Sequence, residues 1–155
     1  MQTSQNDWKQ ISLDRAEYDR LRAVATEQNR GRSEVINFFI ADAFNKAATD
    51  PTLLQDLHVL APVPKNQPRV LTEYFIDDFK MDEIIKSIAF AKEVLPSQVY
   101  RTLIVAGLNH YESLKANGQP FPQIPINQER RDASDEAMRR MAYTVRTGVI
   151  APRYK

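Results

Sequence analysis

The stretch Gly31-Arg32-Ser33-Glu34-Val35-Ile36 joins two segments that have helical periodicity. The segment before it, Arg15 to about Gln28, repeats apolar residues at three- and four-residue intervals. The segment after it, Val35 to Ala47, carries a wider apolar stripe. Gly31 predicts a left-handed residue that ends the first helix, and Ser33 predicts an N-cap for the second. We therefore expect two helices joined by a tight turn.

A short alternating stretch precedes both helices. In Lys9-Gln10-Ile11-Ser12-Leu13 the aliphatic side chains fall on one side and the polar ones on the other, which is typical of a two-faced β-strand. Asp14 follows, with Glu17 three residues later, the spacing of a capping box at a helix start. A strand and two helices in about 40 residues are too little to bury a core alone, so this segment needs a partner.

The same order of elements recurs later in the chain. Val70 to Ile76 is strand-like, Asp78 can cap an apolar helix, and Leu95-Pro96-Ser97 separates that helix from another one with Ser97 as its predicted N-cap. A constant shift of 64 positions matches Asp14 with Asp78, Ala25 with Ala89, Ser33 with Ser97, Val35 with Val99 and Ile40 with Ile104. The shared element types and cap positions indicate an internal repeat.

The repeat divides the chain into parts. Residues 8–47 form a first segment and residues 70–114 a second, joined by a connector at 48–69 that contains a short predicted helix after Asp50 and then three prolines. Residues 1–7 are polar and predicted to be flexible. Residues 115–155 contain a proline-spaced stretch and more basic than acidic residues, with a helix expected from about Asn127 or Ser134 to Arg146.

The composition narrows the class of protein. The chain has 155 residues, 43% hydrophobic and 26% charged, with a net charge of +1, which is typical of a folded domain and gives no global basic field. No stretch approaches the ~20 apolar residues of a membrane span, and no membrane partner is expected. Cysteine is absent, which excludes disulfides and thiolate metal sites, and we expect a cytoplasmic protein.

Enzymatic chemistry has little support. The two histidines, His58 and His110, have no metal-ligand spacing, and the four glycines form no phosphate-cradling loop. We therefore expect no enzyme activity, no catalytic residue, no metal and no cofactor.

The order strand, helix, Gly31 to Ile36 turn, helix resembles the ribbon-helix-helix family of DNA-binding proteins, the Arc and MetJ type. The resemblance implies that two copies pair their strands into an antiparallel ribbon above interlocked helices, and that the ribbon enters the DNA major groove. Here one chain carries both copies. The expected fold is mainly α with one two-stranded antiparallel β-ribbon, a tandem ribbon-helix-helix pseudo-dimer followed by a C-terminal helix.

The resemblance also implies which residues contact DNA. The outward ribbon positions would be Trp8, Gln10 and Ser12 in the first segment, and Thr72 and Tyr74 in the second. The helix starts that clamp phosphates would contribute Arg32 and Ser33 in the first segment, and Ser97, Gln98 and Arg101 in the second. The constant shift also turns Ile76 outward. One inserted residue would instead turn Tyr74 and Ile76 inward and leave Glu73 and Phe75 facing DNA.

Plainer roles remain open for several of these residues. Ser33 and Ser97 can be simple N-caps, Gln10 and Ser12 can be the solvated face of a strand, and Trp8 can cover the edge of the core.

The implied function is sequence-specific binding of double-stranded DNA, as a transcriptional regulator or as an accessory factor in plasmid or mobile-element DNA processing. A homodimer on DNA would extend the short site that one ribbon reads. The basic C-terminal helix would contact flanking phosphates or a partner protein, or would be an ordinary solvated face. The alternative is a protein-interaction module, antitoxin-like or structural, with little DNA binding.

Overall fold

The computed structural model describes residues 8–76 and 78–126, together with residues 128, 132, 136 and 139. The chain divides into two compact units, Met1–Pro125 and Ile126–Lys155. In the second unit residues 128, 132, 136 and 139 are helical, with hydrogen bonds from Gln128 to Asp132 (2.9 Å) and from Arg139 to Glu136 (2.5 Å). The predicted flexible residues 1–7 and most of the predicted C-terminal helix lie outside the described residues.

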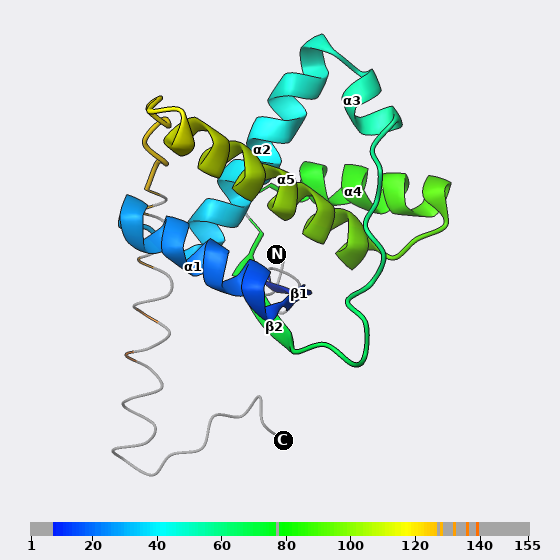
Figure 1. Cartoon of the computed structure of the whole chain (residues 1–155). Helices are drawn as coiled ribbons and strands as arrows, with labels where there is room; N and C mark the ends of the chain where they lie inside the picture. The colour runs from blue at the N-terminus through cyan, green and yellow to red at the C-terminus, as the bar shows by residue number, and fades with distance from the viewer. Residues whose placement is uncertain are drawn as a thin grey trace. The chain divides into compact units, whose positions relative to one another are not determined.

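Seven elements make up the described part of the first unit (Figure 1). They are β1 (Trp8–Asp14), α1 (Arg15–Gln28), α2 (Arg32–Thr49), α3 (Thr52–Gln55), β2 (Arg69–Phe75), α4 (Phe79–Lys92) and α5 (Pro96–Ala116). The two strands pair antiparallel in one sheet. The predicted fold class, mainly helical with one two-stranded antiparallel sheet, is thereby confirmed.

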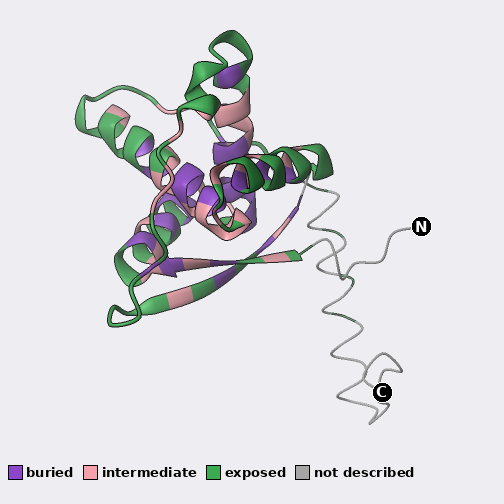
Figure 2. Ribbon diagram, turned by 90° about the vertical axis from the view of Figure 1, so that its right-hand side faces the viewer, coloured by how far each residue is buried: buried purple, intermediate pink, exposed green. Residues whose placement is uncertain are grey.

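The two strands form a twisted ribbon that the helices cover on one face (Figure 2). Trp8 lies opposite Phe75, Gln10 opposite Glu73, and Asp14 opposite Arg69. Because side chains alternate along a strand, the inner face packs on the helices and joins their core. Two isolated strands are marginal in water, so this helical cover is what stabilises the ribbon. The ribbon's inner positions and the helical stripes meet in one cluster that includes Ile11, Leu13, Leu21, Ile36, Phe39, Tyr74, Ile76, Ile85, Val99, Ile104 and Leu108.

The turns between helices differ from the sequence prediction. Asn29, not Gly31, is the left-handed residue after α1, with a φ of 55°, and Gly31 is the extended N-cap of α2 with a φ of −75°. Asparagine tolerates the left-handed region better than most residues, which leaves the glycine free to start the next helix. Ser33 therefore lies inside α2, where Glu34 accepts a hydrogen bond from the Gly31 amide (2.9 Å).

The turn before α5 has the same form. Glu93 is left-handed with a φ of 59°, and Leu95 is the N-cap, so Ser97 is not the cap that the sequence predicted. Gln98 accepts a hydrogen bond from the Leu95 amide (3.0 Å). At α1 the prediction is confirmed, because Asp14 and Glu17 form the expected capping box with bonds of 2.7 and 3.1 Å.

The proline-spaced stretch after α5 packs back on the helices. The Phe121 ring lies 4.7 Å from that of Tyr111 and 5.7 Å from that of Phe38, measured between ring centroids. Ile124 is fully buried, its amide donates to the Gln28 side chain (3.1 Å), and its carbonyl accepts from Arg30 (2.5 Å). These contacts attach the stretch to α1 and to the turn that follows it.

Helices α1 and α5 are joined by polar side chains along their exposed edge. Lys115 and Tyr111 both donate to the Glu27 carboxylate, the former at 2.6 Å. The hydrogen bond from Lys115, and then that from Tyr111, lowers the pKa of Glu27 below its ordinary value of 4.5. The hydrogen bond that Lys115 donates to Glu27 raises the pKa of Lys115 above its ordinary value of 10.5.

Replacing Glu27 by glutamine is expected to remove one pH-dependent contribution to stability. A carboxylate with a lowered folded-state pKa stabilises the protein above the unfolded pKa, and the contribution is lost as the pH falls through the folded pKa. The native chain should therefore be slightly more stable than Glu27→Gln near pH 7, and the difference should vanish as the pH falls below the folded-state pKa of Glu27. Urea unfolding of both chains across this range measures it. A difference that stays constant with pH would contradict the assignment.

Candidate nucleic-acid interface

The outer face of the ribbon is the part of the sheet that no described helix covers. On β1 it carries Trp8 and Gln10, which are exposed, and Ser12, which is half-buried. Ile11 and Leu13, on the opposite face of the strand, are buried. The orientation predicted for the first strand is therefore confirmed. On β2 the outer face carries Leu71, Glu73 and Phe75.

The orientation predicted for the second strand is wrong. Thr72, Tyr74 and Ile76 are 2%, 1% and 4% exposed and face the core. Leu13 is followed directly by the N-cap Asp14, whereas one more residue separates Ile76 from the N-cap Asp78. That extra residue changes the parity of the strand relative to its helix, and a shift of one residue turns every side chain to the opposite face.

The six outward side chains form three cross-strand pairs. In the middle, the Gln10 amide donates to the Glu73 carboxylate at 3.1 Å. At one end the rings of Trp8 and Phe75 pack edge to face with centroids 5.3 Å apart, and toward the other end Ser12 lies opposite Leu71. Gln10 can pair bidentately with adenine, a carboxylate can accept from the cytosine amino group, and apolar side chains can contact the thymine methyl. The face thus has a polar centre between two partly apolar ends.

The start of α2 lies beside this ribbon and carries one exposed cation. The Arg32 guanidinium donates to the Tyr18 hydroxyl and lies 5.4 Å from the centre of the Tyr18 ring. Ser33 is buried, and its hydroxyl accepts from the Phe75 amide at 3.0 Å, while Asn37 donates to the Phe75 carbonyl at 2.6 Å. Ser33 therefore attaches α2 to the edge of β2, and Arg32 is exposed at the first residue of α2.

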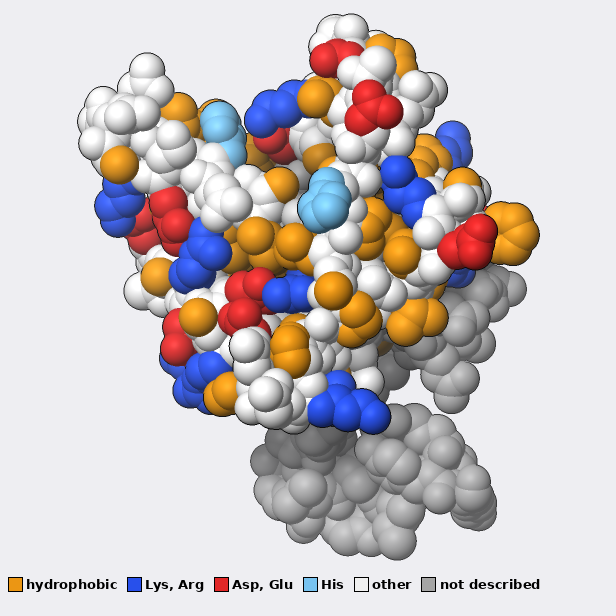
Figure 3. Space-filling view, turned by 45° about the vertical axis from the view of Figure 1, so that its right-hand side comes forward, with side chains coloured by type: hydrophobic (Ala, Val, Ile, Leu, Met, Phe, Trp, Pro, Cys, Tyr) orange, Lys and Arg blue, Asp and Glu red, His pale blue; other side chains and the backbone are white. Residues whose placement is uncertain are grey.

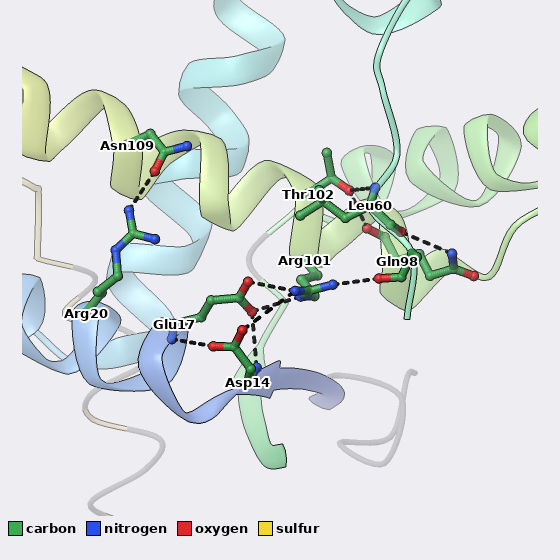
Figure 4. Close-up of polar contacts among 9 residues, drawn as sticks. Asp14, Glu17, Arg20, Leu60, Gln98, Arg101, Thr102 and Asn109 are labelled. Carbon is green, nitrogen blue, oxygen red and sulfur yellow. Dashed lines mark hydrogen bonds and ion pairs between the residues drawn. The ribbon is translucent and has the colours of Figure 1, made fainter. Parts of the chain in front are cut away.

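The start of α5 is occupied by the connector. The Gln98 amide donates to the Leu60 carbonyl (3.2 Å), and the Thr102 hydroxyl accepts from the Leu60 amide (2.9 Å). Arg101 donates to the Ala61 carbonyl (2.6 Å). Figure 4 shows the contacts of Leu60 with Gln98 and Thr102, and the side chain of Arg101 beside them. Ser97 is half-buried in the same turn. The side chains of Gln98 and Arg101, predicted as phosphate contacts, hold the connector in place.

Arg101 is also neutralised by acidic partners. It forms a two-pronged ion pair with Glu17 at 2.7 and 2.8 Å, and Asp14 lies 3.9 Å away (Figure 4). The side chains of Arg101 and Glu17 are only 13% and 10% exposed. The hydrogen bonds to Glu17 raise the pKa of Arg101 further above its ordinary value. A cation so enclosed is a structural tie between α1 and α5.

The inner side of β2 holds a second polar cluster that the sequence did not suggest. The Tyr100 hydroxyl donates to the buried Asp82 carboxylate, which lies 3.2 Å from Lys86 and 3.8 Å from Lys9. The Tyr74 and Tyr100 rings pack with centroids 5.3 Å apart, and burial raises the pKa of both phenols. Two lysines and a tyrosine thus compensate the buried Asp82 carboxylate.

The electrostatic surface is mixed in sign. Acidic and basic side chains alternate on the face drawn in Figure 3, with hydrophobic side chains between them. Among the described residues no group of three or more histidine, cysteine or acidic side chains could hold a metal ion, and no helix there is long and apolar enough to cross a membrane.

No protein-family model, curated protein or solved structure matches the chain. The resemblance to the ribbon-helix-helix family therefore stays a prediction.

Proposed function

We propose that the chain is a tandem ribbon-helix-helix unit that binds double-stranded DNA with the outer face of its ribbon. The observation that carries the proposal is the antiparallel pair β1–β2. One face of this ribbon is buried, and no described helix covers the other face. A two-stranded ribbon fits the major groove, which is about 12 Å wide. Each strand is followed by two long helices, α1 and α2 after β1 and α4 and α5 after β2, which is the order of a paired ribbon-helix-helix unit and supports the tandem assignment.

In this proposal β1 is the main reading strand. Gln10 contacts a base, Ser12 accepts or donates at a neighbouring position, and Arg32 contacts a phosphate beside the groove. The partner strand contributes Glu73 at the centre, and Leu71 and Phe75 at the ends, in place of Thr72 and Tyr74. One ribbon spans only a few base pairs, so two chains side by side would give a useful site. Regulation of transcription and accessory work in plasmid DNA processing both fit such a cytoplasmic protein.

A second function is favoured by the composition of the same face. Trp8 is 45% exposed and Leu71 is 58% exposed, and Glu73 places a carboxylate at the centre, where it would repel phosphates. A ribbon that presents apolar and acidic side chains could instead hold a protein partner, as an antitoxin-like or structural module. The two functions differ in one measurable respect, because only the first requires affinity for duplex DNA that falls with salt.

The test is selection of duplexes from a genomic pool, followed by titration at several salt concentrations. Gln10→Ala should lower affinity for the selected site by about 1–3 kcal/mol and relax its base preference, because one base contact is lost. Arg32→Ala should weaken all duplexes alike and reduce the salt slope by about one. Lys46→Ala, which removes one charge at the far end of α2, is the control and should change neither. Binding no tighter than to random sequence would favour the protein-interaction module.

Replacing Glu73 by glutamine is expected to raise affinity for DNA. The substitution keeps the size and hydrogen-bonding ability of the side chain but removes the negative charge at the centre of the ribbon. Affinity should rise several-fold on all duplexes, and any preference for cytosine should weaken, since the carboxylate accepts from its amino group. Glu93→Gln removes the same charge at an exposed position after α4 and is the control. Equal changes in the two variants would count against the ribbon as the binding face.

A further inference from the structure

The central cross-strand pair of the ribbon holds one amide in a fixed orientation. Gln10 and Glu73 are register partners on the outer face, and Nε2 of Gln10 donates to Oε2 of Glu73 at 3.1 Å. An ionised carboxylate only accepts hydrogen bonds, so the amide must turn its nitrogen, and not its oxygen, toward Glu73. Of the two hydrogens on Nε2 one is used in this bond, and Gln10 keeps the other hydrogen and the Oε1 acceptor for another partner.

The surroundings of this pair favour the same bond when the ribbon loses its water. Among the described residues no lysine or arginine forms an ion pair with Glu73. The two neighbouring outward pairs carry aromatic rings, a serine and a leucine, and no charge. A carboxylate taken out of water is costly unless donors surround it, and the Gln10 amide is the donor beside it. Binding in a groove therefore strengthens the bond and the orientation that it imposes.

The oriented amide matches adenine and does not match guanine. In the major groove adenine presents its N7 acceptor beside the N6 amino donor, whereas guanine presents two acceptors, N7 and O6. The remaining edge of Gln10, one N–H beside Oε1, pairs with adenine at both atoms. A glutamine without Glu73 could rotate its amide and turn both N–H groups toward guanine. The bond to Glu73 withholds one of these groups, and it leaves Oε1 facing an acceptor.

We infer that Glu73 is the positioning residue that makes Gln10 select adenine over guanine at one base pair of the bound site. The inference rests on the proposed binding of DNA by the ribbon, and it adds the base that the centre of the ribbon takes. Glu73 has two opposite effects, because its charge repels the phosphates while its bond to Gln10 discriminates between bases. Removing its side chain should therefore raise the affinity for every duplex and lower the preference for adenine.

The test compares two duplexes, one with adenine and one with guanine at the base pair where Gln10→Ala relaxes the preference of the native chain. The ratio of the two affinities should be at least about 5-fold in the native chain, as expected for one bidentate base contact, and this preference should disappear in Glu73→Ala. In a Gln10→Ala background the removal of Glu73 should leave the ratio unchanged, because Glu73 acts through the amide. Glu93→Gln, which removes a charge after α4 and outside the ribbon, should keep the native ratio.

A second measurement needs no DNA. In a proton–nitrogen correlation NMR spectrum of the full chain, the side-chain amide signals of Gln10 should move more in Glu73→Ala than in Leu71→Ala, a neighbouring outward residue without a polar group. Circular dichroism confirms that each variant is folded. A native chain that binds no duplex more tightly than random sequence would remove this inference together with the proposed function. An adenine preference that survives Glu73→Ala, or Gln10 amide signals that do not move, would overturn the inference alone.

Discussion

Replacing Gly107 by alanine is expected to destabilise the protein by overpacking the contact between α5 and α2. Gly107 lies in the middle of α5, where this helix packs on α2. A Cβ atom there would be 2.3 Å from Cγ of Phe39 and 2.7 Å from both neighbouring ring carbons. Phe39 is 3% exposed and has no room to withdraw. Overpacking of this kind costs about 3 kcal/mol, offset by about 1 kcal/mol of better helix propensity.

We therefore expect Gly107→Ala to lower the free energy of unfolding by about 2 kcal/mol, as measured by urea denaturation. The double variant Gly107→Ala/Phe39→Leu tests the cause, because a smaller side chain at position 39 makes space for the methyl group. Its loss should be clearly smaller than the sum of the two single losses, since residues in contact are not additive. Additive losses, or a more stable Gly107→Ala, would show that the helices do not approach each other in this way.

The second large effect is expected from Arg101→Ala. The substitution leaves the Glu17 carboxylate nearly buried beside Asp14 without its cation, and it removes the hydrogen bond to the connector at Ala61. Removing one partner of an enclosed ion pair is far more costly than losing a pair on the surface. The free energy of unfolding should fall by about 2–4 kcal/mol near pH 7.

Arg20→Ala is the matched control for this variant. Arg20 also forms an ion pair between α1 and α5, with Glu112 at 2.8 Å, but the two side chains are 30% and 48% exposed. Arg20 also donates to the Asn109 side chain at 2.6 Å (Figure 4). Its removal should cost well under about 1 kcal/mol, because water compensates exposed charges. The experiment is urea denaturation of both variants beside the native chain. Similar losses for Arg101→Ala and Arg20→Ala would contradict the structural role assigned to Arg101.

Much of the fold could be predicted from periodicity. The alternation of Ile11 and Leu13 identifies the first strand and its inner face, and the stripes identify α1, α2, α4 and α5. The face of β2 could not be predicted in this way, because apolar residues occur on both sides of it: Leu71 and Phe75 on one, Tyr74 and Ile76 on the other. The number of residues between strand and helix decides between them. The constant shift of 64 assumes the same number in both segments, whereas the alternative with one inserted residue gives the observed face.

The candidate site was harder to predict than the fold. Arg101 was predicted to contact a phosphate. Its actual partners, Glu17 and Ala61, lie far away in the sequence, and no local pattern indicates them. Ser33 was predicted as the N-cap of the second helix because serine favours N-cap positions. In the structure Gly31 is the N-cap, and the Glu34 side chain accepts the hydrogen bond from the Gly31 amide. In contrast, strand alternation correctly predicts that Gln10 faces outward, and Arg32 lies at the start of α2 as expected, while their contacts with DNA stay predictions.

The most direct measurement for the DNA-binding proposal is the fluorescence of Trp8, the single tryptophan of the chain, which lies on the outer face of the ribbon. Titration with a selected duplex at low salt should change the intensity or wavelength of its emission in a saturable way. Added salt should reverse the change as the phosphate contacts are lost. A duplex that binds without altering Trp8 emission, or one that never binds, would contradict the assignment of this face as the DNA-reading surface.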